Sequence, residues 1–338
     1  MLNTYGDISP RTAAFAAKML LARGKPLMII ERFGQFDPQG KNKTKTRKYR
    51  RYESLARATA PLAEGVSPAG QALTYTDVTV TLEQFGDVVK LTDVIQDTHE
   101  DPVLDEMMTL VGEQSAETIE VTRILILKGG TSVTYADGVA SRSLVNGVLT
   151  RGQIRKMVRT FKRNRAKKIT KIIKASMRIS TEPVAPSFPV IAHTDTEPDV
   201  LDINGFVPYE QYSDSGQQIS EAEVGKVEGC RFFLTDLVEP WSQAGLAGTK
   251  YLSGGATVDA NTACDVYPML FIGRDSYGLV PLAGSNAIKP IVQNPNVSRG
   301  GDLLGQQGGV GWKTMQATVI LNQLWIQRYE TAATAEPA

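Results

Sequence analysis

Residues 102–130, PVLDEMMTLVGEQSAETIEVTRILILKGG, form the longest helical pattern in this chain of 338 residues. Pro102 is favoured in the first turn of a helix, and Gly129 with Gly130 is a strong stop signal. The sequence therefore predicts a helix over 102–128, about 40 Å long at about 1.5 Å per residue. A helix of this length needs a long surface to pack on, which the rest of the chain must supply.

The two faces of this helix differ in polarity. Apolar residues at helical spacing predict a buried stripe, formed by Val103, Met107, Leu110, Val111, Ile119, Ile124 and Leu127. Acidic residues are expected at the surface, namely Asp105, Glu106, Glu113, Glu117 and Glu120. The wider stretch 77–120 holds twelve acidic residues against a single lysine. We therefore expect an acidic outer surface along the helix.

Residues 41–51, KNKTKTRKYRR, carry seven positive charges and no negative one. Their spacing predicts a strand with a cationic face, made by Lys41, Lys43, Lys45, Arg47 and Arg51. Neither face is apolar, so this strand is expected to project from the body and to contact nucleic acid or an acidic protein surface. Residues 76–83 alternate in polarity and predict a second strand returning beside the first. With twelve residues, the ribbon would reach about 40 Å.

A second basic stretch, 151–178, carries twelve positive charges and no acidic residue. A helix with a buried face is predicted there by Ile154, Met157, Val158 and Phe161. The outer face of this basic helix would consist of Arg155, Lys156, Arg159, Lys162 and Arg163. Such a face is either solvated or turned toward a polyanion, and the sequence leaves both readings open.

The remaining sequence mixes helical and strand patterns. A short helix is predicted over 10–23, and strands are predicted over 188–193, 230–238 and 266–273. A single long closing strand is expected over 312–330, with Met315, Ala317, Val319, Leu321 and Trp325 on one face. This mixture indicates an α+β fold.

The ionisable side chains form no familiar catalytic or metal-binding set. His99 and His193 are the only histidines, and surface or capping roles fit His99 better than catalysis. Cys230 and Cys264 are too few and too far apart to indicate a zinc site or a disulfide framework. We expect both cysteines to be buried small side chains in a reducing compartment.

The glycine-rich stretch GQQGGVGWKT (305–314) fails as a phosphate-binding loop, because Trp312 separates the last glycine from the lysine. A flexible lead-in to the closing strand is the better interpretation. No apolar run approaches the length of a membrane helix. We predict a protein with no enzyme activity, cofactor, metal or membrane span.

The order of these elements resembles the major capsid proteins of tailed bacteriophages. Three stretches carry the resemblance, TYGDISPRTAAFAAKMLLARGKPLMIIERFGQ (4–35), GVSPAGQALTYTDVTVTLEQFGDVVKLTDVI (65–95) and SAETIEVTRILILKGGTSVTYADG (115–138). The similarity covers nearly the whole chain.

The resemblance implies a tailed-phage capsid fold with an N-terminal arm, an extended β-hairpin loop, a long spine helix in a peripheral domain, and a mixed axial domain. The expected boundaries are an arm over 1–39, the hairpin loop over 40–85, the peripheral domain with the spine helix over 86–135, the axial domain over 136–304, a closing strand of the peripheral domain over 305–332, and a tail over 333–338.

The resemblance also implies a function. The chain would be a structural subunit that self-assembles into the icosahedral shell of a virion around double-stranded DNA. Its expected partners are identical subunits as hexamers and pentamers, scaffolding and portal proteins, and DNA by non-specific contact. Assembly would take place in the host cytoplasm. No precursor segment is evident before the arm, so we expect scaffolding to come from another protein.

The charge pattern suggests how copies meet. The cationic face of 41–51 would contact acidic residues of a neighbouring spine helix, such as Asp105, Glu113 and Glu117, in a contact that repeats around a ring. The basic helix would face DNA. The main alternative is a nucleic-acid-binding protein that uses 41–51 and 151–178 directly. An enzyme of unfamiliar type is a third possibility.

Overall fold

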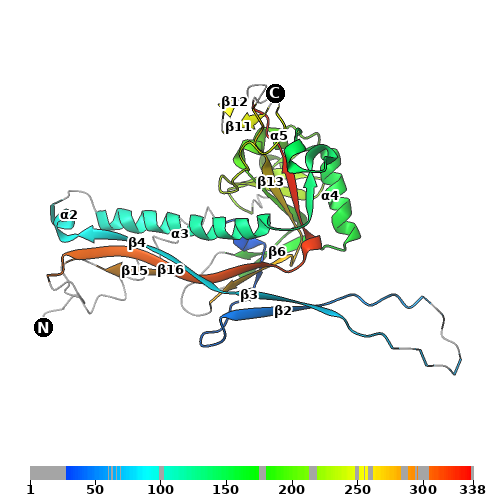
Figure 1. Ribbon diagram of the computed structural model, residues 1–338, viewed down its shortest axis with the longest axis horizontal. Coiled ribbons are helices and arrows are strands. Elements are labelled where there is room, and N and C mark those ends of the chain that lie inside the picture. Colours follow the sequence, from blue (N-terminus) through cyan, green and yellow to red (C-terminus); the bar gives the residue numbers. More distant parts are fainter. Residues whose placement is uncertain are drawn as a thin grey trace.

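The computed structural model describes residues 28–59, 61, 64–65, 67–68, 70–98, 103–174, 180–212, 219–247, 251–254, 256–257, 262–282, 288–293, 295 and 304–335. Two larger β-sheets, a long helix and a projecting hairpin build an elongated α+β molecule (Figure 1). The predicted fold class is confirmed. The helix expected over 10–23 and His99 lie outside the described residues.

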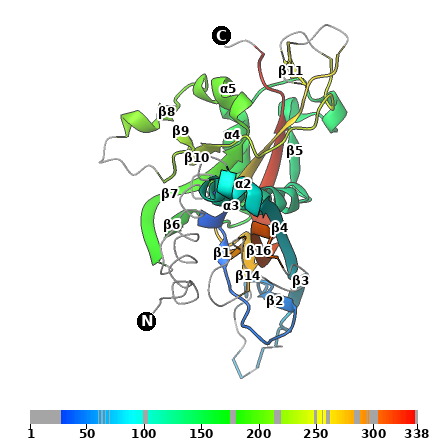
Figure 2. The ribbon, with the colours of Figure 1, turned by 90° about the vertical axis from the view of Figure 1, so that its left-hand side faces the viewer.

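The long helix α3 (Val103–Lys128) forms within the predicted range. It lies along one face of a five-stranded sheet, with the body of the molecule at its C-terminal end (Figures 1 and 2). A short helix, α2 (Asp93–Thr98), precedes it. Acidic side chains in the first turn of α3 and Lys128 in its last turn both complement the helix dipole.

The five-stranded sheet is organised around its longest strand, β16 (Gln307–Ile320). This strand pairs antiparallel with β4 (Glu83–Thr92), β15 (Ile288–Gln293) and β14 (Tyr277–Pro281). The short β1 (Gln35–Phe36) adds to β14 in parallel. Residues from both ends of the chain therefore build the surface on which α3 packs.

Glycines bring β4 and β16 close together. Residues 307–314 belong to β16, so the expectation of a flexible lead-in over 305–314 is wrong. A Cβ atom on Gly309 would lie 2.8 Å from the carbonyl oxygen of Val89, and one on Gly311 would lie 2.9 Å from that of Asp87. Side chains do not fit at such distances, so glycine here serves a close approach of two strands.

The interface between α3 and the sheet is a separate apolar cluster. It consists of Leu91, Met107, Met108, Val111, Ile119, Val310 and Trp312. Two predictions for the faces of the helix are wrong. Leu110 is 57% exposed, whereas Glu120 is fully buried beside Ile29 and Ile30. The correction for Glu120 arises because the chain before the hairpin packs on α3 as a second partner.

The body contains an eight-stranded sheet. Its order is β5 (Val133–Tyr135), β17 (Ile326–Thr331), β13 (Tyr267–Ile272), β7 (Ser180–Ala192), β10 (Cys230–Leu234), β9 (Glu223–Val227) and β8 (Val207–Pro208), with β6 (Ile169–Lys174) paired to β7. The three strands predicted in this region are β7, β10 and β13. The smaller elements are α5 (Glu197–Leu201), β11 (Leu252–Ser253) and β12 (Ala256–Thr257).

A second helix, α4 (Arg151–Arg163), packs on this sheet through its four predicted apolar residues, Ile154, Met157, Val158 and Phe161. The basic stretch 151–178 is not one helix, however. After Arg163 the chain turns, with Arg165 at a φ of 54°, and the N–H of Ala166 donates to the carbonyl of Phe161 at 2.9 Å. The β-branched residues that follow favour a strand, and β6 begins at Ile169.

The closing strand expected over 312–330 is two strands in two sheets. β16 ends at Ile320, a 3₁₀ turn covers Gln323–Trp325, and β17 continues in the sheet of the body. The side chain of Asn322 stabilises the turn by accepting the N–H of Leu324 at 3.1 Å. This segment links the two sheets covalently.

The hairpin is formed by β2 (Thr46–Tyr52) and β3 (Tyr75–Thr81), which pair antiparallel along their whole length and extend away from the body (Figure 1). The strand expected from residue 41 begins later, because Asn42 has a φ of 58° in a turn. Seven paired residues span about 23 Å rather than the expected 40 Å.

Candidate assembly interface

The base of the hairpin is continuous with the sheet under α3. β3 and β4 are consecutive, and Leu82 between them is buried and donates its N–H to the carbonyl of Lys45 at 3.0 Å. The chain therefore changes partner at this residue, from β2 to β16. This junction fixes the direction in which the hairpin leaves the molecule.

The predicted cationic face divides into free and paired side chains. Lys41, Lys43 and Lys45 lie at the hairpin base, and within the described residues they form no ion pair. Arg47 instead pairs with Asp37 at 2.5 Å, and Arg51 pairs with Glu53 at 2.8 Å. The structure thus does not bring the five cations together as one free surface.

The other face of β2 is neutralised within the hairpin. Lys48 and Arg50 approach Asp77 on β3 at 2.7 and 2.8 Å. Hydrogen bonds from both cations hold the pKa of the Asp77 carboxyl well below its usual range. Arg50 also stacks over the ring of Tyr75 at 4.2 Å. These contacts set the register of two strands that have no core of their own.

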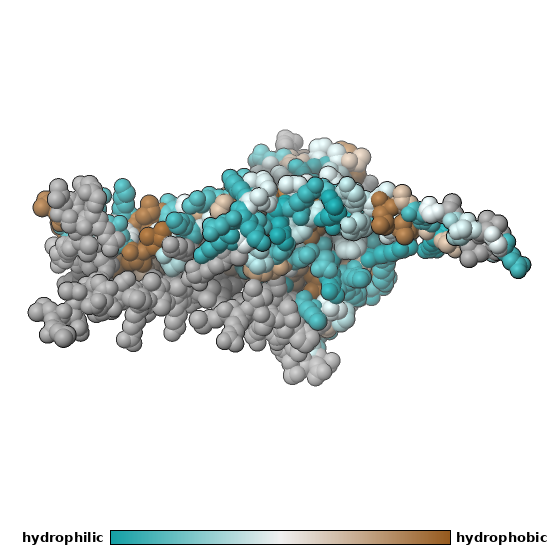
Figure 3. All heavy atoms as spheres, turned by 90° about the horizontal axis from the view of Figure 1, so that it is seen from below, coloured by the Kyte–Doolittle hydropathy of each residue, from teal (hydrophilic) through white to brown (hydrophobic). Residues whose placement is uncertain are grey.

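Large apolar side chains occur further along the hairpin, which the sequence patterns did not predict. Tyr52, Leu55, Leu73 and Tyr75 are each 55–66% exposed. The rings of Tyr52 and Tyr75 meet edge to face, with centroids 6.4 Å apart. Figure 3 shows hydrophobic side chains on the projecting part of the molecule, next to hydrophilic ones. The sequence feature that could have indicated this apolar surface is the pair Tyr52 and Tyr75, which lie opposite each other at one end of the paired strands.

The acidic residues of α3 differ in how accessible they are. Asp105 is exposed, whereas Glu113 and Glu117 are half-buried. All three remain at or near the surface of the helix, in a stretch that also carries the exposed Glu106. An acidic strip therefore exists on α3, although it is weaker than predicted because Glu120 does not belong to it.

Glu120 instead attaches the chain before the hairpin to the helix. Its Oε1 accepts the backbone N–H of Ile29 at 2.9 Å and that of Ile30 at 2.7 Å. Burial raises the pKa of Glu120 to about 6, against the opposing effects of Arg123 and these two hydrogen bonds. Arg123 also pairs with Glu31 at 3.3 Å, which closes the buried cluster.

The C-terminal end of α3 is held by the body. Arg328 on β17 donates to the carbonyls of Lys128 and Gly130, which would otherwise lack partners at the end of the helix. Its guanidinium also pairs with the buried Glu330 at 2.8 Å, and Arg142 pairs with the same carboxylate at 2.6 Å. This network joins the helix to the eight-stranded sheet.

The outer face of α4 carries the predicted basic residues. Lys156, Arg159, Lys162 and Arg163 are exposed, and no ion pair among the described residues involves them. Arg155 differs, because its guanidinium pairs with the carboxylate of Glu228 at 2.9 Å. Arg151 pairs with the same carboxylate at 2.7 Å. Four of the five predicted cations thus form a free basic surface on the body.

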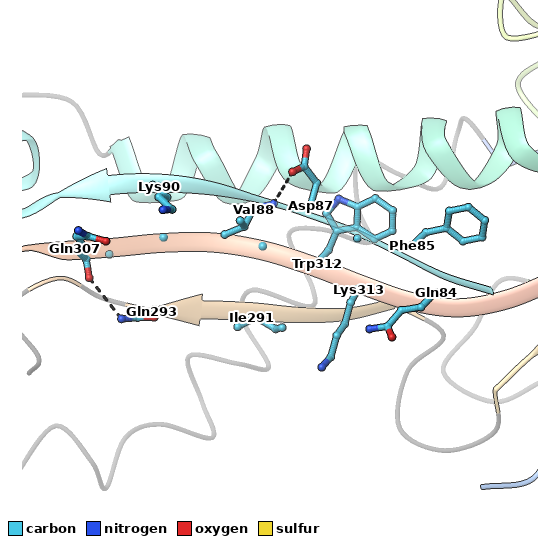
Figure 4. A pocket seen from close by; sticks show the side chains of 14 residues that line it. Gln84, Phe85, Asp87, Val88, Lys90, Ile291, Gln293, Gln307, Trp312 and Lys313 are labelled. Atoms are coloured by element: carbon cyan, nitrogen blue, oxygen red, sulfur yellow. Dashed lines mark hydrogen bonds between the residues drawn. The ribbon is translucent and has the colours of Figure 1, made fainter. Parts of the chain in front are cut away.

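The five-stranded sheet is hollowed on the side away from α3. A groove of about 680 Å³ lies over Gly309 and Gly311, with Val88 on β4 and Ile291 on β15 among the residues that line it. Figure 4 shows Lys313 pointing away from α3 into this side. The described residues that line the groove include no histidine or cysteine, and their amide and amine groups are suited to polar contact.

The described residues contain no group of side chains that could bind a metal ion, and no described helix is both long and apolar enough to cross a membrane. His193 caps the turn before α5, with Nδ1 accepting the N–H of Asp195 at 3.0 Å. Cys230 and Cys264 are buried free thiols, as predicted.

Comparison with known proteins gives a consistent result. A family model described as phage capsid protein matches residues 75–326. The chain is similar in structure to the capsid of Ralstonia phage GP4, with a TM-score of 0.66, 10% identity, and 92% of each chain covered.

Two further capsids resemble the chain in fold. The head structure of Helicobacter pylori bacteriophage KHP40 has a TM-score of 0.59 and 12% identity, covering 90% of this chain and 88% of that one. The capsid of cyanophage P-SCSP1u has a TM-score of 0.56 and 11% identity, with the same coverage. No curated protein matches the chain. The alternative of a dedicated nucleic-acid-binding protein gains no support from these comparisons.

Proposed function

The chain belongs to the phage capsid protein family, and from this premise we propose how its copies contact one another and DNA. It is a major capsid protein, a structural subunit of the icosahedral shell of a phage virion. We assign the five-stranded sheet with α3 to the peripheral domain and the eight-stranded sheet to the axial domain. The copies assemble as hexamers and pentamers around double-stranded DNA, in the host cytoplasm, with scaffolding and portal proteins.

The projecting hairpin is the observation that supports an intersubunit contact. An isolated two-stranded ribbon is marginally stable in water, and here it also exposes Tyr52, Leu55, Leu73 and Tyr75. Covering these side chains on a neighbouring copy would remove apolar area from water. The hairpin therefore overlies the adjacent subunit in this proposal.

Charge sets the orientation of this contact rather than its strength. Lys41, Lys43 and Lys45 are free to meet the acidic strip of a neighbouring α3, where Asp105 is exposed. Exposed ion pairs contribute only about 0–1 kcal/mol each. Complementary charges mainly select the partner and the register. Arg47 and Arg51 hold the hairpin together within its own copy.

This division of roles leads to a sharp test. Changing the three lysines together, Lys41→Glu, Lys43→Glu and Lys45→Glu, should abolish closed shells in negative-stain images while the subunit keeps its circular dichroism spectrum. The matched control changes the same three residues to arginine, which preserves charge, and should assemble. Normal shells from the glutamate variant would refute the proposed role of these lysines.

The free basic surface of α4 is proposed to face the packaged DNA. Non-specific contact with phosphates releases counterions, so binding should weaken with salt. Replacing Lys156, Arg159 and Lys162 by glutamine should lower the salt dependence of DNA binding, with the logarithmic slope smaller by about 0.9 for each phosphate that the variant no longer neutralises. Arg155→Gln is the control, because that side chain already pairs with Glu228. An unchanged slope in the triple variant would count against a DNA-facing α4.

A further inference from the structure

The outer edge of β4 has no partner strand in the part of the chain that the structure describes. Asp93 donates its N–H to the carbonyl of Gln306 at 3.1 Å, directly after the last residue pair of β4 and β16. In an antiparallel pair, successive residues direct their backbone groups to opposite sides. Odd-numbered residues of β4 therefore bond to β16, and even-numbered ones point outward. No described strand pairs with that outer side.

This edge has little of the usual protection, because Lys90 is the one charged residue among its outward positions. Its outward positions Gln84, Gly86, Val88 and Lys90 are all exposed. Val88 is 58% exposed and its neighbour Val89, which points to the other face, is 42% exposed. Long exposed edges with apolar side chains invite pairing with another chain, and most proteins blunt them. Figure 2 shows β4 at the margin of the sheet, beside α3.

The outer edge of β2 is unpaired in the same way. The N–H of Leu82 donates to Lys45 and the N–H of Glu53 donates to Thr74, so the odd-numbered residues of β2 face β3. The even-numbered residues Thr46, Lys48 and Arg50 therefore direct their backbone groups outward. Among the described residues, β3 is the one strand that pairs with β2.

The two edges cannot meet within one copy. β2 and the free side of β4 lie on the same side of the continuous segment 75–92, because Leu82 points to β2 and Glu83 points to β16. To cover the edge of β4 within the same copy, the residues that precede Lys45 would have to extend β2 as a strand. The chain instead turns away there, with Asn42 at positive φ. Only a second copy can bring a β2 strand to the edge of β4.

Charge favours the same pairing. β2 keeps a small excess of positive charge, because its four cations pair with three carboxylates of the same copy, Asp37, Glu53 and Asp77. The surroundings of the β4 edge carry more acidic than basic side chains, with Glu83 and Asp87 on the strand and Glu113 and Glu117 on α3, against Lys90 at the edge itself. Edge-to-edge pairing supplies main-chain hydrogen bonds. Opposite charges favour pairing of β2 with β4, whereas repulsion between like charges disfavours pairing of two identical edges.

We infer that the outer edge of β4 pairs with the outer edge of β2 from a neighbouring copy, which joins hairpin and sheet into one β-structure across the subunit boundary. This inference rests on the proposed function and specifies its contact. Asp87 already occupies one outward group of this edge, because its Oδ1 accepts the N–H of Val88 at 2.8 Å. Gln114 on α3 holds the carboxylate in place by donating to its Oδ2 at 2.7 Å. The incoming strand bonds the remaining outward groups.

Cysteine cross-linking tests the pairing directly. Val88→Cys is combined in one chain with Thr46→Cys, Lys48→Cys or Arg50→Cys, which samples three registers. Opposed residues of paired strands lie within the span of a disulfide. Shells of one of these variants should give dimers and larger species on a non-reducing gel. The matched control, Val88→Cys with Thr79→Cys, places the thiol on the opposite edge of the hairpin and should stay monomeric.

The outcomes separate this inference from the proposed function. Shells in which all three pairs keep free thiols would overturn the pairing and leave the capsid role intact. Failure of the unsubstituted protein to form any shell would overturn both. A second experiment uses Lys90→Pro, which removes an outward N–H that β16 does not use. Subunits of this variant should fold yet assemble at least tenfold less than Lys90→Ala, and equal assembly of the two would contradict the pairing.

Discussion

The buried carboxyl of Glu120 should make the stability of the subunit depend on pH in an unusual direction. It is fully buried, and burial raises its pKa from 4.5 to about 6. The proposed change is Glu120→Gln, which keeps an oxygen to accept the two N–H groups of Ile29 and Ile30 but cannot ionise. The other charged or titratable groups near it, Glu31, Arg32, Arg123 and Tyr277, are unchanged.

The size of the effect follows from linkage. A folded-state pKa that exceeds the unfolded value means that the folded chain binds the proton more tightly, so stability is full below about pH 4.5 and falls as pH rises through about 6. One pKa unit corresponds to about 1.4 kcal/mol, which gives about 2 kcal/mol for this shift. The Glu120→Gln variant cannot ionise at this position, so its free energy of unfolding does not fall in this way. Relative to the wild type, it should therefore gain about 2 kcal/mol between pH 4 and pH 7.

Urea unfolding of the unassembled subunit measures this difference. The free energy of unfolding of both proteins is determined at pH 4, 5, 6 and 7, and their difference cancels the titration of all other carboxyls. Glu106→Gln, on the exposed side of the same helix, controls for the loss of one negative charge. A wild-type-minus-variant difference that stays constant with pH, or that shifts in favour of the wild type at pH 7, would refute the reasoning.

Three further predictions concern single closely packed or buried residues. Gly311→Ala should lower the free energy of unfolding by about 1–3 kcal/mol, because a Cβ there meets the backbone of β4, and thermal unfolding of the subunit would reveal it. Arg142→Ala should cost about 3 kcal/mol, since it leaves the buried Glu330 with one arginine, and equal stability of this variant and wild type would contradict the network. Burial raises the pKa of Cys230 to about 12, so neither it nor Cys264 should react with a thiol reagent at pH 8 before unfolding.

Local patterns were sufficient where a segment has one partner. The buried face of α4 is formed by the four residues that its spacing predicts, and α3 begins and ends close to its proline and glycine signals. α4 packs on a sheet along a single side, so amphipathic periodicity describes it well. The same holds for β3, whose alternation identified it.

The misjudged residues are those with a second, distant partner. Glu120 looks like a surface acid, but it binds backbone groups some ninety positions earlier in the chain. The glycines of β16 look like a loop until β4 is placed against them. Arg47 looks free until Asp37, which precedes the hairpin, is located beside it. Periodicity carries no information about contacts of this kind.

The sequence by itself determined the two long helices α3 and α4, the hairpin, the α+β class and the resemblance to capsid proteins, because these depend on spacing within a segment. Only the tertiary structure decided which charges are free, where the closing segment passes from one sheet to the other, and which strand edges are left open. Those properties depend on which distant segments pair, and pairing fixes both the direction of backbone hydrogen bonds and the neutralisation of side chains. The open edge of β4 could not have been identified without the pairing of β4 with β16.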